Sequence, residues 1–248
     1  MRVAIVSGGG TGIGAAIARA LTDSCGTLVL LGRRPDRLAA VAAELGTSHP
    51  DVLIHTRSVD LTDVAAVAAF CAWADDALPQ VDVLVNNAGS PQPRIEGGLG
   101  DVAAAWLATW RANTLSAVLL TEGLKGQLAR PGGRIVTIGS FAAQLGTGSP
   151  AYASAKAALE TYAISLMREL GADGITANIV APGFTDGTEL LAGRITPERR
   201  ERLLASISAR RPGTPEEIAG LVAYLASPAA GFVNGQVVTA NGGTYLPG

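Results

Sequence analysis

Seven short apolar runs recur along the chain, and segments with helical character lie between most of them. The runs cover residues 3–7, 27–31, 52–56, 81–85, 134–138, 175–181 and 237–240. Strands that alternate with helices form parallel sheets, because each helix carries the chain back across a face of the sheet before the next strand begins. The alternation predicts an α/β fold with one doubly wound, seven-stranded parallel sheet. Ligands of such sheets bind outside the carboxyl ends of the strands.

The length of the chain and the absence of dividers favour a single unit. A chain of 248 residues fits one large α/β domain as well as two small ones. No Pro/Ser-rich linker, charge block or internal repeat interrupts it, so we expect a single domain over residues 1–248. The segment 190–207 is rich in arginine and lies between glycine and proline breaks, which predicts a small helical lid at about 188–210.

The charge, the cysteines and the amino-terminal sequence argue against several classes of protein. A net charge of −2 with scattered arginines provides no field for nucleic acid. Cys25 and Cys71 lack metal or redox spacing, so we expect a cytoplasmic protein without a metal site. The first apolar run is too short for a signal peptide.

The tail from residue 218 to residue 248 carries no charged side chain. Pro228, Gly231 and later glycines break it into pieces that are too short to span a membrane. We therefore expect no membrane contact. The tail instead predicts a buried helix end and a last core strand, covered by a second subunit.

A glycine-rich stretch, residues 8–14, follows the first apolar run and precedes a helical segment at 15–21. In a strand–turn–helix unit, glycines let the backbone approach a diphosphate, and the helix N-terminus supplies free N–H groups. The Gly-x-x-x-Gly-x-Gly spacing alone is a weak signal, since chance places one in a chain this rich in glycine about half the time. Its position after the first strand predicts a dinucleotide-binding, Rossmann-type fold.

Arg33 and Arg34 follow the second apolar run, where an acidic residue would hold the ribose hydroxyls of NAD. Arginine at this place accommodates the 2′-phosphate of NADP instead. Asp36 is close, but after Pro35 it is typical of the first turn of a helix. Two solvated arginines at a helix start are the alternative. We expect NADP(H), with NAD(H) as the less favoured cofactor.

Small polar residues occupy the ends of four further strands. Asp60 follows the third run, where it would accept a hydrogen bond from an adenine amino group or else cap a helix. Asn87 follows the fourth run, Ser140 the fifth, and the segment 182–188 closes the sixth. Because the carboxyl ends of parallel strands meet at one edge of the sheet, we expect these residues to form one site.

Tyr152 and Lys156 lie four residues apart at the head of a helical segment, 151–171, so they share one helix face. A phenol has a pKa of about 10, and an ammonium roughly 5 Å away lowers that pKa by about two. Tyr152 would then suit general acid–base catalysis. With four tyrosines and two lysines in 248 residues, chance predicts only about 0.03 such pairs, which favours catalysis over a solvated aromatic and charge.

Three residues in the helical segment 102–129 allow more than one interpretation. Asn113 would face the cleft and hold a water if it is functional, and would merely compete for backbone hydrogen bonds if it is not. Trp106 and Trp110 lie four residues apart, which indicates the core or a subunit interface rather than a substrate box.

Jointly these features resemble the short-chain dehydrogenase/reductase family, in its single-domain branch, over essentially the whole chain. The glycine stretch, the Asn86-Asn87-Ala88-Gly89 motif, the Tyr152-x-x-x-Lys156 pair, Pro182-Gly183 and the last-strand Asn241-Gly242-Gly243 carry the resemblance. It implies a catalytic tetrad of Asn113, Ser140, Tyr152 and Lys156. It also implies a set of cofactor-binding residues, which are Gly8, Thr11, Gly12, Ile13, Gly14, Arg33, Arg34, Asp60, Leu61, Asn87, Ala88, Gly89, Tyr152, Lys156, Pro182, Gly183, Thr185 and Thr188.

The resemblance implies hydride transfer that interconverts a ketone and a secondary alcohol. Tyr152 would be the general acid or base, and Ser140 would orient the substrate oxygen. Lys156 would lower the pKa of the phenol and bind the nicotinamide ribose, while Asn113 would hold a water that relays protons. A 3-oxoacyl thioester on an acyl-carrier protein is one candidate among small carbonyl substrates. The helices of Asn113 and Tyr152, with the tail, would pair subunits into a homotetramer or homodimer.

Two other functions compete with this one. A dinucleotide-binding regulator or scaffold would keep the fold without turnover. Such a protein would not need a tyrosine whose pKa is adjusted for proton transfer, so the set of Ser140, Tyr152 and Lys156 argues against it. A nucleotide-sugar epimerase would need an extra carboxyl-terminal substrate domain. The substrate pocket is expected in loops, with an apolar portion indicated by Phe184, Leu190 and Leu191. A basic mouth for an acidic carrier is indicated by Arg194, Arg199, Arg200 and Arg202.

Overall fold

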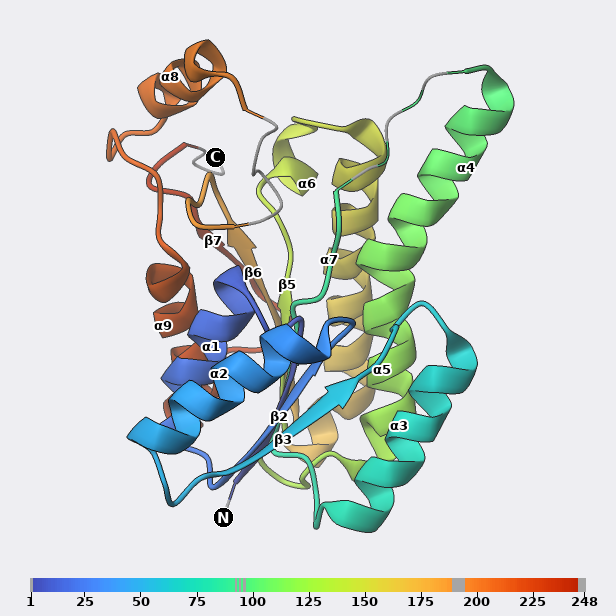
Figure 1. Ribbon diagram of the computed structural model, residues 1–248, viewed down its shortest axis with the longest axis vertical. Helices are drawn as coiled ribbons and strands as arrows, with labels where there is room; N and C mark the ends of the chain where they lie inside the picture. Colours follow the sequence, from blue (N-terminus) through green and yellow to red (C-terminus); the bar gives the residue numbers. More distant parts are fainter. Residues whose placement is uncertain (1, 92, 94, 96, 189–194, 245–248) are drawn as a thin grey trace.

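The computed structural model describes residues 2–91, 93, 95, 97–188 and 195–244 (Figure 1). Seven strands form one sheet in the order β3-β2-β1-β4-β5-β6-β7, and every pairing is parallel. The strands are β1 Val3–Ser7, β2 Thr27–Gly32, β3 Leu53–Ser58, β4 Val83–Asn86, β5 Arg134–Ile138, β6 Thr176–Pro182 and β7 Val237–Ala240. The predicted α/β fold and its parallel sheet are confirmed, with strand ends shifted by at most two residues.

Helices cover both faces of the sheet (Figure 1). One face holds α1 Gly12–Thr22, α2 Pro35–Ser48 and α9 Pro215–Ala226, and the other holds α3 Val64–Ala77, α5 Ser116–Leu124 and α7 Pro150–Leu170. The remaining helical segments are α4 Leu99–Trp110, the π-helical η1 Arg111–Leu115, α6 Ala142–Leu145, α8 Pro197–Ser206 and the 3-10 turns η2 Lys125–Gln127, η3 Gly171–Asp173 and η4 Pro228–Ala230. Helices α6 and α8 and the start of α4 stand beyond the carboxyl ends of the strands, so this edge of the sheet is framed by helices.

Strand β1 shows why the core forms on both faces. Val3 and Ile5 pack with α3, α5 and α7, while Ala4 and Val6 pack with α1, α2 and α9. Successive side chains of a strand point to opposite faces, so a strand in the middle of a doubly wound sheet needs apolar residues at every position. All four residues are at most 1% exposed.

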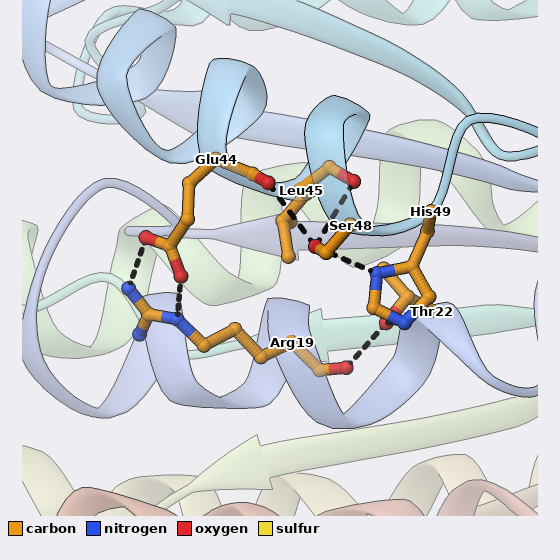
Figure 2. A network of polar contacts seen from close by, with 6 residues as sticks. All are labelled: Arg19, Thr22, Glu44, Leu45, Ser48 and His49. Carbon is orange, nitrogen blue, oxygen red and sulfur yellow. Dashed lines mark hydrogen bonds and ion pairs between the residues drawn. The ribbon is translucent and has the colours of Figure 1, made fainter.

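A polar network joins α1 and α2 at the ends of these helices away from the glycine-rich stretch (Figure 2). The Arg19 guanidinium donates two hydrogen bonds of 2.7 Å to the Glu44 carboxylate. This contact holds the pKa of Glu44 below its usual range. Ser48 bonds back to the last turn of α2 and contacts His49 Nδ1 at 3.0 Å, while His49 Nε2 lies 3.4 Å from Thr22 Oγ1. The network fixes the far ends of two helices whose N-termini lie at the sheet's carboxyl edge.

Four details refine the sequence expectations. The helix that follows the third strand, α3, is capped by Asp63 and not by Asp60, because the Asp63 carboxylate accepts from Ala65 N and Ala66 N. The helical segment from 102 contains a π-helical turn around Asn113. The last strand, β7, lies at one edge of the sheet, and its residues are half-buried within this single chain. Trp106 and Trp110 are 42% and 45% exposed, so they do not lie in the core of this chain.

The predicted lid is described only in part. Helix α8 falls within the expected range 188–210, and residues 189–194, including Leu190, Leu191 and Arg194, lie outside the described residues. Across the described part of the chain, no helix is both long and apolar enough to cross a membrane.

Candidate active site

A cleft of about 690 Å³ runs along the carboxyl ends of the strands. Every residue that the sequence analysis assigned to the tetrad or to cofactor binding lines this cleft. They are Gly8, Thr11, Gly12, Ile13, Gly14, Arg33, Arg34, Asp60, Leu61, Asn87, Ala88, Gly89, Asn113, Ser140, Tyr152, Lys156, Pro182, Gly183, Thr185 and Thr188. The fold therefore brings residues from eight chain segments to one site, and six of these segments follow strand ends, as predicted.

The glycine loop between β1 and α1 is built so that its backbone can face a ligand. Gly8 has a φ of +66°, and a Cβ there would stand 2.7 Å from Asn87 Nδ2. A Cβ on Gly14 would stand 2.0 Å from the Gly8 carbonyl oxygen, so only glycine lets α1 start this close to the loop. Thr11, the N-cap of α1, makes no side-chain capping bond. The first turn thus retains N–H groups for an anion, which fits the diphosphate of a dinucleotide.

Ser7 connects the glycine loop to the end of β4, a role that the sequence analysis missed. Its hydroxyl accepts from Asn87 N at 2.9 Å and from Ala88 N at 3.0 Å, and it donates to Val85 O at 3.2 Å. The Asn87 side chain returns a 2.9 Å bond to Ser7 O. Ser7 is only 1% exposed. The signal available in the sequence is a hydroxyl residue that ends a strand directly before the glycines.

Three arginines line the end of the cleft that lies away from Tyr152 and Lys156. Arg33 and Arg34 were expected there, and Arg37 joins them one helical turn further on. The loop and α2 approach closely, since a Cβ on Gly10 would stand 3.1 Å from Arg37 Cβ. Arg34 Nη2 donates to Thr11 Oγ1 at 3.4 Å, which links this wall to the glycine loop. Three cations near one α-helix N-terminus suit a phosphate group.

Asp60 lies beside the arginine wall. Its Oδ1 accepts from Thr62 N at 2.9 Å and from Thr62 Oγ1 at 2.8 Å. These hydrogen bonds hold the pKa of Asp60 below its ordinary value, so the carboxylate is charged at neutral pH. The helix cap is Asp63, which leaves Asp60 available to the cleft.

Asn113 is held by the π-helical turn between α4 and α5. Its Nδ2 donates to Thr109 O at 2.9 Å and to Ser90 O at 2.8 Å, while Oδ1 accepts from Ser90 N at 3.1 Å. The side chain is 1% exposed. A π-helical turn departs from the regular i→i−4 bonding of the helix, and such turns recur at functional sites. Asn113 thereby fixes the Ser90 end of the loop that follows β4.

Tyr152 and Lys156 occupy the first turns of α7, whose start is set by Ser149 and Pro150. Ser149 Oγ accepts from Tyr152 N at 3.3 Å, and proline occupies the first helical position. The Lys156 ammonium is 4% exposed, donates to Ile138 O at 2.7 Å, and lies 5.9 Å from the centroid of the Tyr152 ring. A Cβ on Gly89 would stand 2.8 Å from Asn113 Oδ1 and 3.7 Å from Lys156 Nζ, so glycine keeps the approach between these groups open.

The protonation of this pair differs from the sequence expectation. Burial raises the pKa of the Tyr152 phenol to about 12, although its hydrogen bond with Ser140 acts in the opposite direction. Burial also lowers the pKa of the Lys156 ammonium to about 8. The expected lowering of the phenol pKa is therefore wrong for the chain's own side chains, because burial disfavours the phenolate more than the hydrogen bond with Ser140 favours it. At neutral pH the site presents a protonated phenol beside a cation.

The cleft also includes residues that the sequence analysis did not single out. Besides Arg37 they are Gly10, Gly32, Leu38, Val59, Thr62, Ser90, Pro91, Ala112, Ser116, Ile138 and Gly139. Most carry no side chain that stands out in a sequence, since they contribute backbone or apolar wall.

Comparison with known proteins agrees with this geometry. Residues 8–245 match the sequence model of the family described as enoyl-(acyl carrier protein) reductase. The 3-oxoacyl-(acyl-carrier-protein) reductase FabG of Vibrio harveyi is 32% identical over 99% of this chain and 98% of its own length. Nodulation protein G of Rhizobium sp. strain N33 is 35% identical over 99% of this chain and 97% of its own length.

A solved structure shows the same fold. The blue fluorescent protein from a metagenomic library, in complex with NADPH, superposes with a TM-score of 0.88 at 33% identity, covering 99% of this chain and 98% of that one. Family, relatives and fold agree with a cleft that suits a nicotinamide dinucleotide beside a protonated phenol. The chain therefore belongs to the short-chain dehydrogenase/reductase family and is an oxidoreductase that acts on CH–OH groups.

Proposed function

We propose that this oxidoreductase uses NADP(H) to interconvert a ketone and a secondary alcohol, with Tyr152 as the general acid in reduction and the general base in oxidation. The observation that carries the proposal is the arrangement of the cleft. One end holds the protonated phenol of Tyr152 with Ser140 and Lys156, and the other end is lined by Arg33, Arg34 and Arg37.

The chain's own groups each have a step in this reaction. A bound nicotinamide supplies or accepts the hydride at the carbon of the substrate. Ser140 Oγ donates a hydrogen bond that orients the substrate oxygen, and Tyr152 Oη donates the proton that this oxygen needs when it becomes a hydroxyl. Lys156 stabilises the negative charge left on the phenolic oxygen. Asn113 orders the Ser90 loop, and we propose that it also holds a water through which the proton is replaced.

The choice of NADP(H) rests on charge at the strand end after β2. Arginine recognises phosphate through planar, charged hydrogen bonds, and an acidic residue at this place would repel the 2′-phosphate. We expect Arg33→Asp together with Arg34→Ala to move the ratio of kcat/KM values from NADPH toward NADH. An unchanged ratio would show that this end of the cleft does not read the phosphate.

Several relatives are 3-oxoacyl-(acyl-carrier-protein) reductases, so we propose a 3-oxoacyl thioester as the substrate class. Arg199 and Arg202 on α8 are exposed and would meet an acidic carrier. The proposed compartment is the cytoplasm.

The proposed assembly is a homotetramer, or a homodimer of the same surfaces. Helix α4 exposes a row of apolar side chains, and the tail exposes Phe232 completely. The row consists of Leu99, Trp106, Leu107 and Trp110. Apolar surface of this kind marks an interface, and light scattering after gel filtration measures the mass directly.

The reaction itself is tested by mixing the protein with NADPH and a panel of ketones and 3-oxoacyl thioesters. Loss of the reduced-nicotinamide absorbance with a ketone supports the proposal. Tight NADPH binding without turnover on any member of the panel would contradict it.

A further inference from the structure

Helix α8, Pro197–Ser206, stands away from the body of the molecule beyond the carboxyl end of the sheet (Figure 1). None of its residues is buried, and none lines the cleft. A surface helix is normally held by an apolar face that packs on the core. On α8 only Leu203 and Leu204 are half-buried apolar residues, so its position depends largely on its ends and on polar contacts.

The carboxyl end of α8 is fixed to the tail of the chain. Ile207, directly after the helix, is 2% exposed, and a Cβ on Gly242 would stand 2.8 Å from its Cγ2. Ala209 N donates to Gly242 O at 3.0 Å, and Ser208 Oγ donates to Gly243 O at 3.0 Å. This end is therefore a fixed point about which the rest of α8 can be oriented.

A second attachment within the described residues is an ion pair between the middle of α8 and the turn 183–188. The Arg200 guanidinium makes two bonds to the Asp186 carboxylate, Nη1–Oδ1 at 2.7 Å and Nη2–Oδ2 at 2.6 Å. Its Cζ also lies 5.4 Å from the centroid of the Phe184 ring. Two parallel bonds between a guanidinium and a carboxylate, with an aromatic ring beside the guanidinium, fix the orientation of the arginine side chain as well as its distance from the carboxylate.

Asp186 does not line the cleft itself, but it lies between two residues that do. Thr185 and Thr188 both line the cleft, and Thr188 Oγ1 donates to Thr185 O at 3.3 Å. The Asp186 backbone is fixed on the far side, where its N–H donates to Gly213 O at 3.0 Å. Anything that orders this turn from the cleft side therefore also orders the Asp186 carboxylate, and with it the partner of Arg200.

We propose that Asp186 and Arg200 are positioning residues that couple occupancy of the dinucleotide cleft to the position of α8. Filling the cleft beside Thr185 and Thr188 fixes the turn, and the ion pair transmits this order to a helix that does not itself line the cleft. The inference rests on the proposed function only for the identity of the dinucleotide. The two side chains are 43% and 44% exposed, so the ion pair is weak and screened by salt. We therefore expect the coupling to change the amide exchange rate of α8 only a few-fold.

Hydrogen–deuterium exchange on the full chain tests this coupling. In the wild type at low salt, saturating NADPH is expected to slow exchange of the amides in α8 by at least about threefold. Asp186→Asn and Arg200→Gln are each expected to abolish that slowing, and high salt to reduce it. The double variant Asp186→Arg with Arg200→Asp restores the ion pair with reversed charges. It is expected to recover part of the slowing of amide exchange in α8.

A matched control breaks an equivalent ion pair elsewhere. Arg19→Gln removes the bidentate bonds to Glu44 between α1 and α2 (Figure 2), and it is expected to leave the response of α8 to NADPH unchanged. The proposal would be overturned if NADPH still slows amide exchange in α8 of both Asp186→Asn and Arg200→Gln. It would also be overturned if amide exchange in α8 of the wild type does not change although fluorescence titration shows that NADPH binds. Slowing of α8 without reduction of any ketone would leave this inference standing and contradict the proposed function.

Discussion

The ammonium of Lys156 lies 5.9 Å from the centroid of the Tyr152 ring and donates a 2.7 Å hydrogen bond to the carbonyl of Ile138. The cation is thus anchored to the end of β5 rather than to the phenol. Burial lowers the pKa of Lys156 to about 8 and raises that of Tyr152 to about 12. In the reductive direction the site holds a proton on the phenol and a positive charge beside it, and the cation is the group that titrates nearer to neutrality.

The pH dependence of reduction is the first prediction. Because the ammonium is present below its pKa of about 8 and lost above it, kcat/KM for reduction should fall as the pH rises through about 8. Tyr152, with a pKa of about 12, stays protonated over this range. A steady-state profile at saturating NADPH measures the effect. Lys156→Arg should remove the inflection, since a guanidinium keeps its charge, and an inflection that remains in this variant would assign it to another group.

The stability cost of Lys156 is the second prediction. The folded chain lowers the pKa of Lys156 from 10.5 to about 8, so between these values the unfolded chain binds more protons and the free energy of unfolding rises with pH. At neutral pH the buried ammonium is therefore destabilising. Lys156→Met should raise the free energy of unfolding by about 1–3 kcal/mol at neutral pH while abolishing turnover. Urea unfolding provides the measurement, and a less stable Met variant would contradict the prediction.

The third prediction concerns Gly89, where the lack of a side chain leaves room between Asn113 and Lys156. A methyl group there meets Asn113 Oδ1 at 2.8 Å and comes near Lys156 Nζ. Gly89→Ala should lower kcat by at least about tenfold, because the catalytic groups shift out of alignment. Gly46→Ala is the matched control. Nothing lies within 4 Å of the added Cβ in this exposed helical position, so it should stabilise the chain by about 0.5–1 kcal/mol without changing kcat. Equal kcat values for both variants would refute the assignment.

Ser7 carries the fourth prediction. Ser7→Ala removes the acceptor of two backbone N–H groups, those of Asn87 and Ala88. The free energy of unfolding should fall by about 2–3 kcal/mol, and the Kd for NADPH should rise because the glycine loop loses its connection to β4. Ser206→Ala is the control, since Ser206 is exposed and its hydroxyl donates to Leu203 O within its own helix turn. Its effect on unfolding should stay within about 0.5 kcal/mol, and a similar loss in both variants would show that Ser7 has no special role.

Features set by local chemistry could be predicted from the sequence. The apolar run of β1 predicts a buried strand, and all five of its residues are buried. The Tyr152–Lys156 spacing alone places both side chains on one helix face. The meeting of Gly8, Asn87 and Ser140 at one edge follows from the parallel arrangement of the strands, which is a property of the whole pattern.

Features that depend on contacts between distant segments could not be predicted. The π-helical turn at Asn113 accompanies bonds to Ser90, a residue 23 positions away. The pKa of Tyr152 depends on how completely the fold removes water from the phenol, so the attraction of a nearby ammonium taken alone gave the wrong direction. The Asp186–Arg200 pair joins a turn to a helix that sequence patterns show only as arginine-rich.

The central claim is that the Tyr152 hydroxyl supplies the proton in reduction, and single-turnover reduction of a ketone by enzyme-bound NADPH tests it most directly. For Tyr152→Phe we predict a rate lower than that of the wild type by at least about a thousandfold, with an unchanged Kd for NADPH. A phenylalanine variant that reduces the ketone within tenfold of the wild-type rate would contradict the account.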